Sequence, residues 1–122
     1  MGIKKINIKE KLSLFSDYWN PRIVGELNGQ HIKLAKINGE FVWHKHDNED
    51  EMFLVISGSF DMQLRDETIA LSVGDFIIIP KGVEHKPVAH KPAEIMLFEP
   101  ANTVNTGDNN PSDLTRKTLD KI

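Results

Sequence analysis

The sequence contains no cysteine among its 122 residues. This absence excludes disulfide bonds, thiolate metal sites and cysteine nucleophiles together. Apolar runs near the roughly 18 residues of a transmembrane helix are also missing, and the start of the chain lacks the apolar core of a signal peptide. We therefore expect a cytoplasmic protein without a membrane partner.

An excess of basic charge is missing as well. The 15 Lys and Arg residues are outnumbered by 18 Asp and Glu residues, and the net charge is −3. The basic residues are scattered, so the chain lacks the electrostatic footprint of a nucleic-acid-binding protein, and we expect no nucleic-acid partner. Its length, with 39% hydrophobic and 27% charged residues, is typical of one soluble domain with a single core.

The most informative stretch runs from residue 38 to 58. His44 and His46 stand two apart among aromatic and β-branched residues, and on a strand this spacing points both imidazoles to the same face. Four polar residues suited to a turn follow, and Glu51 then opens a second apolar run. A later block adds His85 after a Pro-x-Gly turn. Three neutral imidazoles and one carboxylate are a ligand set that divalent transition metals favour.

The first block resembles the first motif of the cupin family. That motif runs Gly, five residues, His-x-His, three or four residues, Glu, six residues, Gly. His44, His46, Glu51 and Gly58 match the variant with four residues, whereas Asn38 stands at the leading glycine position.

The second block resembles the second cupin motif, which runs Gly, five residues, Pro-x-Gly, two residues, His, three residues, Asn. Gly74, Pro80, Gly82 and His85 match it, and Ala89 takes the place of the asparagine. Joint spacing of both motifs identifies the fold more sharply than the substrate, because this fold hosts unrelated chemistries.

The resemblance implies a small single-domain cupin, similar to mannose-6-phosphate isomerase-like cupins. The expected fold is all-β: a double-stranded β-helix (jelly-roll) barrel with a short N-terminal helix and an irregular C-terminal arm. We expect the helix and lead-in at residues 1–21, the barrel at 22–100 and the arm at 101–122. The resemblance also implies one divalent metal held by His44, His46, Glu51 and His85.

Periodicity predicts the individual elements. Ile8, Leu12 and Phe15 recur at helical spacing, which predicts an amphipathic helix over residues 5–16 with Asn7 as its cap. Short apolar runs at intervals of eight to twelve residues are typical of a β-barrel. Beyond the strand that carries the histidine pair, the predicted strands are 22–27, 31–37, 52–56, 60–64, 68–71, 76–79, 85–89 and 95–98.

Two predicted strands, 53–56 and 76–79, are apolar on both faces, whereas a strand with one wet face alternates. Their outer faces must be covered by the N-terminal helix, the C-terminal segment or a second subunit. The arm is polar and turn-rich. We expect it to lie partly ordered on the barrel or on a partner, with a short helical turn from residue 112 or complete disorder as alternatives. Because the arm is too polar to cover both strands, we expect a homodimer.

Alternation also suggests a pocket. Phe41, Met62 and Leu64 are predicted to line it, and Glu84, which flanks His85, is predicted to supply a polar contact. Trp43 precedes a ligand and should face the opposite side, where it packs.

Several alternatives stay open. Asp50 replaces Glu51 as the carboxylate ligand if the loop takes the shorter spacing, and a barrel that has lost its metal would hold the same residues by hydrogen bonds. His31, at a strand start outside both motifs, is expected to be exposed and not a ligand.

Metal identity is open among Fe, Mn, Ni, Co and Zn. Three histidines and a carboxylate leave two positions of an octahedral shell for water, dioxygen or a ligand. We therefore expect a metal-dependent protein that acts on or binds a small sugar-like or carboxylate-bearing metabolite. An isomerase, epimerase, lyase or dioxygenase and a non-catalytic binding or sensing module both remain open, because no general acid or base stands out beyond the ligands and Glu84 or Glu49.

Overall fold

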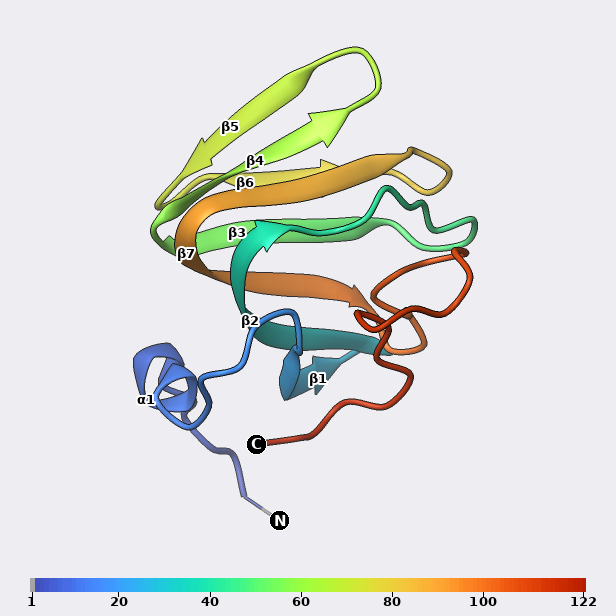
Figure 1. Cartoon of the computed structure of the whole chain (residues 1–122). Coiled ribbons are helices and arrows are strands. Elements are labelled where there is room, and N and C mark those ends of the chain that lie inside the picture. The colour runs from blue at the N-terminus through green and yellow to red at the C-terminus, as the bar shows by residue number, and fades with distance from the viewer. Residues whose placement is uncertain (1) are drawn as a thin grey trace.

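The computed structural model describes residues 2–122 and consists of one short helix, seven strands and a long irregular C-terminal segment (Figure 1). Every pair of neighbouring strands is antiparallel, which confirms the predicted all-β jelly-roll barrel. The elements are α1 (Ile8–Leu12), β1 (Arg22–Leu27), β2 (Gln30–Glu40), β3 (Glu51–Ser57), β4 (Ser59–Leu64), β5 (Thr68–Ser72), β6 (Phe76–Ile79) and β7 (His85–Pro100).

The strand β7 joins the two layers of the barrel. Its first half pairs with β4, and its second half lies between β2 and β3. Figure 1 shows β7 curving from one layer to the other. The barrel interior lies between these layers and holds the main hydrophobic core, which includes Ile37, Phe53, Val55, Met62 and Ile95.

The prediction of two separate strands at 85–89 and 95–98 was wrong, because β7 runs without a break through Pro92. Its pairing with β2 shifts register between Ile37 and Gly39, where Ala93 and Ala89 are the respective partners. Pro92 lies inside this bulge, where a strand tolerates the missing N–H group of proline.

The strand β2 is buried on both faces. His31, Lys33 and Ala35 are buried on one face, and Leu34 on the opposite face belongs to a second core cluster that contains Leu12 of α1. The N-terminal helix therefore covers the outside of β2. It is shorter than predicted and ends at Leu12, although Asn7 caps it as expected by accepting a hydrogen bond from the Glu10 N–H at 2.8 Å.

No segment of residues 2–122 covers the outer face of β6. Phe76 and Ile78 are 62% and 56% exposed, and β6 pairs with β3 alone among the strands of residues 2–122. The neighbouring strand β3 is better protected, because Ile56 packs against the cluster beneath α1. Of the two strands that are apolar on both faces, β6 is thus the one whose outer face stays exposed in the single chain.

The C-terminal arm, residues 101–122, lies against the barrel as an irregular chain, as expected, and the alternative of a helical turn from residue 112 is not found in this range. The Asn105 side chain holds the arm together, since it donates to the Leu114 carbonyl and accepts from the Arg116 N–H. The end of the arm returns to β1, where the Ile122 N–H donates to the Ile23 carbonyl at 3.0 Å. Figure 1 shows the arm at one end of the barrel.

Within residues 2–122, no helix has both the length and the apolar character needed to cross a membrane.

Candidate metal centre

Backbone pairing brings two of the predicted ligands side by side. The prediction that His44 and His46 lie on a strand was wrong, because the chain between β2 and β3 is irregular. This segment forms a single β-bridge, which joins His44 to His85. The His44 N–H donates to the His85 carbonyl at 3.0 Å, and the His85 N–H donates to the His44 carbonyl at 2.9 Å. Glu51 opens β3 and His85 opens β7, so the motif residues meet where these strands begin.

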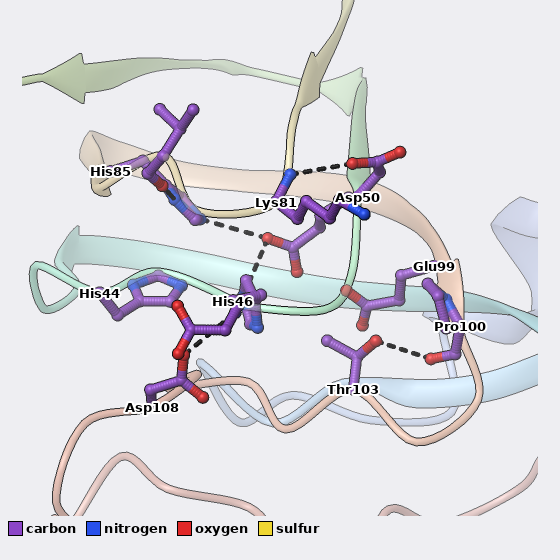
Figure 2. A network of polar contacts seen from close by, with 12 residues as sticks. His44, His46, Asp50, Lys81, His85, Glu99, Pro100, Thr103 and Asp108 are labelled. Carbon is purple, nitrogen blue, oxygen red and sulfur yellow. Dashed lines mark hydrogen bonds and ion pairs between the residues drawn. The ribbon is translucent and has the colours of Figure 1, made fainter.

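The four predicted ligands form one buried cluster. His44, His46, Glu51 and His85 are each at most 4% exposed, and one donor atom from each lies within 4.8 Å of all the others. Figure 2 shows the three histidines around a common centre. The alternative carboxylate, Asp50, is exposed and accepts a hydrogen bond from the Lys81 N–H at 2.8 Å.

The backbone sets the tautomer of two histidines. Nδ1 of His44 lies 2.8 Å from the Val42 carbonyl oxygen, and Nδ1 of His85 lies 2.9 Å from the Val83 carbonyl oxygen. Because a carbonyl oxygen can only accept, each Nδ1 carries the proton and donates. In the neutral rings the Nε2 lone pairs are therefore free, and this second contact is how proteins usually orient a metal-binding histidine.

The arrangement fits a cation. Nε2 of His46 lies 3.3 Å and Nε2 of His85 lies 3.2 Å from the same carboxylate oxygen, Oε1 of Glu51. Nε2 of His46 is buried and has no hydrogen-bond partner within the described chain. Lone pairs that converge in this way repel each other unless a proton or a cation lies between them. A divalent transition metal meets that need and matches the donor set.

Burial and charge put two of the four ligands, His44 and Glu51, in the protonation states that bind a metal. Burial, and then the neighbouring His85, lower the pKa of His44 to about 4, so His44 is neutral at pH 7. Burial raises the pKa of Glu51, but contacts with Glu99, His46 and His85 outweigh burial and hold it well below its usual value. Burial lowers the pKa of His46, but Glu51 more than offsets this, and the pKa of His46 is raised. A neutral His44 and an ionised Glu51 are the forms that bind a metal.

A small cavity adjoins the cluster inside the barrel. Its volume of about 40 Å³ is room for roughly three water molecules. Most of its wall is apolar and includes Trp19 and Phe41, whose rings stack at 4.8 Å. The polar residues of the wall are His44, Glu51, Glu99 and Asn105.

The predicted pocket residues are distributed unevenly around this cavity. Phe41 lines it. Met62 is fully buried in the main core, Leu64 packs against that core, and Glu84 is exposed and pairs with Arg65 at 2.7 Å, so these three lie outside the cavity wall. Contact of the three with a ligand stays a prediction.

Two further predictions concern aromatic residues outside the ligand set. Trp43 packs as expected, under the Arg65 guanidinium at 3.9 Å from its ring. His31 is not one of the four clustered residues, as expected. The prediction that it is exposed was wrong, because it is only 9% exposed on the inward face of β2, opposite Glu99 of β7.

Sequence reasoning missed a buried ion pair beside the cavity. Lys33 and Glu99 are each 2% exposed, and Nζ of Lys33 donates to Oε1 of Glu99 at 2.7 Å. Lys33 resembles a solvent-facing residue because it alternates with Ile32 and Leu34. Lys33 stands two residues before Ala35, so the two side chains point to the same face of the strand, and Ala35 is buried. That spacing could have predicted that Lys33 points into the barrel.

The C-terminal arm holds the ligand segment in place, which the sequence also did not indicate. The Asp108 N–H donates to the Lys45 carbonyl at 3.0 Å, and the Asp108 carboxylate accepts from the Asp47 N–H at 3.0 Å. The Asn109 side chain donates to the Trp43 carbonyl at 2.6 Å. These contacts flank both His44 and His46.

Comparison with known proteins agrees with this fold. The cupin domain family model matches residues 31–99. The chain is 34% identical over 103 residues to the uncharacterized protein YdbB of Bacillus subtilis (strain 168), covering 75% of this chain and 85% of that protein.

Two solved structures are similar over most of their length. A cupin-2 domain containing protein from Shewanella frigidimarina is 47% identical with a TM-score of 0.77, covering 78% of this chain and 93% of that one. Protein NMB1881 from Neisseria meningitidis is 26% identical with a TM-score of 0.74, covering 80% of this chain and 100% of that one. The matched region contains all four clustered residues and the strands that carry them, and the chain is therefore a member of the cupin family.

Proposed function

We propose that this protein is a metal-dependent enzyme that binds one divalent transition-metal ion and acts on a small sugar-like or carboxylate-bearing metabolite. His44, His46, Glu51 and His85 hold the ion. The observation that carries the proposal is the convergence of these four buried donors within 4.8 Å of one another beside a cavity. The reaction classes that this site suits are isomerisation, epimerisation, elimination and dioxygenation.

When bound, the ion supplies a Lewis acid, or a site for dioxygen, with two positions left for ligand atoms. The protein supplies orientation and exclusion of water. The backbone carbonyls keep the rings of His44 and His85 turned towards the centre. The stacked rings of Trp19 and Phe41 form an apolar wall beside His44, with Phe41 edge-on to the His44 ring at 5.3 Å between centroids.

The test begins with protein purified without an affinity tag that binds metal. Metal content per chain is measured by elemental analysis, before and after incubation with Fe(II), Mn(II), Co(II), Ni(II) or Zn(II). We expect about one ion per chain. Thermal shifts are then screened against small hydroxy acids, keto acids and sugars, and we expect stabilisation by a metabolite in the metal-loaded protein alone.

The metabolite that stabilises the protein is next incubated with the metal-loaded form, and its conversion is followed by mass spectrometry and NMR. Conversion supports the enzyme. Binding without conversion would instead identify a binding or sensing module. If the protein binds none of the five metals, the proposed function as a whole is overturned.

We also propose that the protein is a homodimer in which the exposed face of β6 is covered by a second copy. Phe76 and Ile78 support this proposal, because both are more than half exposed on an edge strand and such apolar faces favour association.

A further inference from the structure

Glu99 occupies an unusual position for a carboxylic acid. It projects from β7 into the barrel, 2% exposed, and one of its oxygens, Oε1, accepts a hydrogen bond from Lys33 at 2.7 Å. Figure 2 shows its carboxyl group pointing towards the histidines. Glu99 also lies in side-chain contact with Glu51; burial, and then the charge of Glu51 and this contact, raise the pKa of Glu99 well above its usual value, against the opposing effect of Lys33.

The second oxygen of Glu99 receives no hydrogen bond from the described residues. Oε2 is buried and has no hydrogen-bond partner within residues 2–122, and Glu99 lines the cavity beside the metal cluster. A buried polar atom without a partner is costly, and most such atoms in native structures have one. A buried ion pair is also no requirement for stability, since apolar residues of similar volume often serve as well. The Lys33–Glu99 pair therefore calls for a functional explanation.

The other polar groups of the cavity are already engaged. His44 and Glu51 belong to the metal cluster. The amide of Asn105 is used at both ends, since its nitrogen donates to the Leu114 carbonyl and its oxygen accepts from the Arg116 N–H. Oε2 of Glu99 is thus the polar atom of the wall that remains available to a ligand.

We propose that Glu99, fixed by Lys33, determines specificity by pairing through Oε2 with a hydroxyl group of the metabolite, and that the metabolite is a short hydroxy acid or the hydroxy acid end of a longer molecule. This proposal rests on the proposed function, because the carboxylate of the hydroxy acid binds at the metal. A hydroxyl group suits Glu99 in either protonation state, since it donates to a carboxylate and accepts from a carboxylic acid.

Charge and size narrow the ligand class. A divalent ion and the Lys33 ammonium outweigh Glu51 and Glu99, so the loaded site carries a formal net positive charge even when both carboxyl groups are ionised. An anionic ligand offsets that charge. The cavity volume of about 40 Å³, room for roughly three water molecules, limits the part of the ligand inside the barrel to a few carbon atoms.

The experiment uses Co(II)-loaded full-length protein and two pairs of probes, lactate against propionate and 3-hydroxybutyrate against butyrate. Dissociation constants are measured by calorimetry and by the visible spectrum of Co(II). We expect the wild type to bind at least one hydroxy acid about tenfold or more tightly than its deoxy counterpart, the ratio that one hydrogen bond to a charged group provides.

The test variant is Lys33→Met/Glu99→Met, which removes both partners so that no buried charge is left unpaired. It should lose about tenfold of the hydroxyl preference while its Co(II) content per chain stays at the wild-type level. The matched variant Lys33→Met/Glu99→Gln should recover part of the preference, because an amide also pairs with a hydroxyl. Circular dichroism shows whether each variant is folded.

The possible results separate the role of Glu99 from the binding of metal. An unchanged preference in the folded Lys33→Met/Glu99→Met variant, at full Co(II) content, overturns the role of Glu99 and leaves the metal site intact. If the wild type binds hydroxy acids and their deoxy counterparts with equal affinity, that result alone overturns the role of Glu99. A wild-type protein that takes up no metal overturns both this inference and the proposed function.

Discussion

His44 is buried as a neutral ring, and its position makes the metal-free protein sensitive to acid. Because burial and His85 lower the pKa of His44 in the folded state to about 4, below the usual value near 6.5 for an unfolded chain, protons bind the unfolded state more strongly. The associated stability is present above pH 6.5 and is lost as pH falls through the folded pKa.

We predict that at pH 4 this loss amounts to about 3 kcal/mol in the metal-free protein. Urea unfolding of metal-free wild type and His44→Gln at pH 7 and pH 4 measures it. Since Gln does not titrate, the free energy of unfolding should fall by about 3 kcal/mol less in the variant than in the wild type. Equal falls in the two proteins would show that His44 is not the acid-sensitive group.

The sequence identified the four residues of the metal cluster but not Glu99. His44, His46, Glu51 and His85 stand in two spaced motifs, and the folded chain gathers all four. Glu99 belongs to no motif, and its partner Lys33 lies 66 positions away in the sequence. A charged residue on a strand predicts a solvent-facing side chain, and only the pairing of β2 with β7 shows that this one is buried with a partner.

At the scale of the elements, the contact between the arm and the ligand segment has the clearest consequence. Gly107 has φ +61°, and a Cβ atom there would collide with the Lys45 carbonyl oxygen. We predict that Gly107→Ala displaces the arm from the segment that carries His44 and His46 and weakens metal binding by about tenfold, as loss of a residue that orients a metal ligand commonly does. Metal titration of the folded variant measures the effect.

Gly29→Ala is the matched control. Gly29 also has a positive φ, +75°, but a Cβ atom there would meet nothing within 4 Å, so the variant carries the backbone strain without the collision. Equal metal affinities in the two variants would mean that the arm does not position the ligands.

Other errors at this scale arose where an element departs from its regular pattern. Proline predicted a break at residue 92, yet β7 accommodates Pro92 in a bulge at the bend between the two layers. The His-x-His spacing predicted a strand, yet a single bridge to His85 is enough to place His44. Such irregular geometry is stabilised by contacts with distant parts of the chain, which local patterns do not contain.

At the scale of the whole molecule, the all-β barrel followed from its regular run of short strands and from the two motifs. The arrangement of copies does not follow from one chain. The apolar face of β6 leads us to predict a dimer of the 13.9 kDa chain, because burying each large apolar side chain contributes about 1.5–3 kcal/mol.

Light scattering of the wild type at high micromolar concentration should therefore give twice the mass of one chain. Phe76→Lys/Ile78→Lys should reduce the mass to that of one chain with an unchanged circular dichroism spectrum. Leu14→Lys, which changes an exposed leucine near α1, is the control and should remain dimeric. A monomeric wild type would contradict the prediction.

The measurement that tests the account most directly is the metal content and metal affinity of wild type, His85→Ala and His90→Ala under the same limiting metal concentration. His85 is fully buried in the cluster, whereas His90 is an exposed histidine later in the same strand. We predict about one ion per chain in wild type and His90→Ala, and a metal affinity lower by an order of magnitude or more in a folded His85→Ala, because one donor of four is removed. Equal metal content and affinity in His85→Ala and His90→Ala would contradict the metal centre described here.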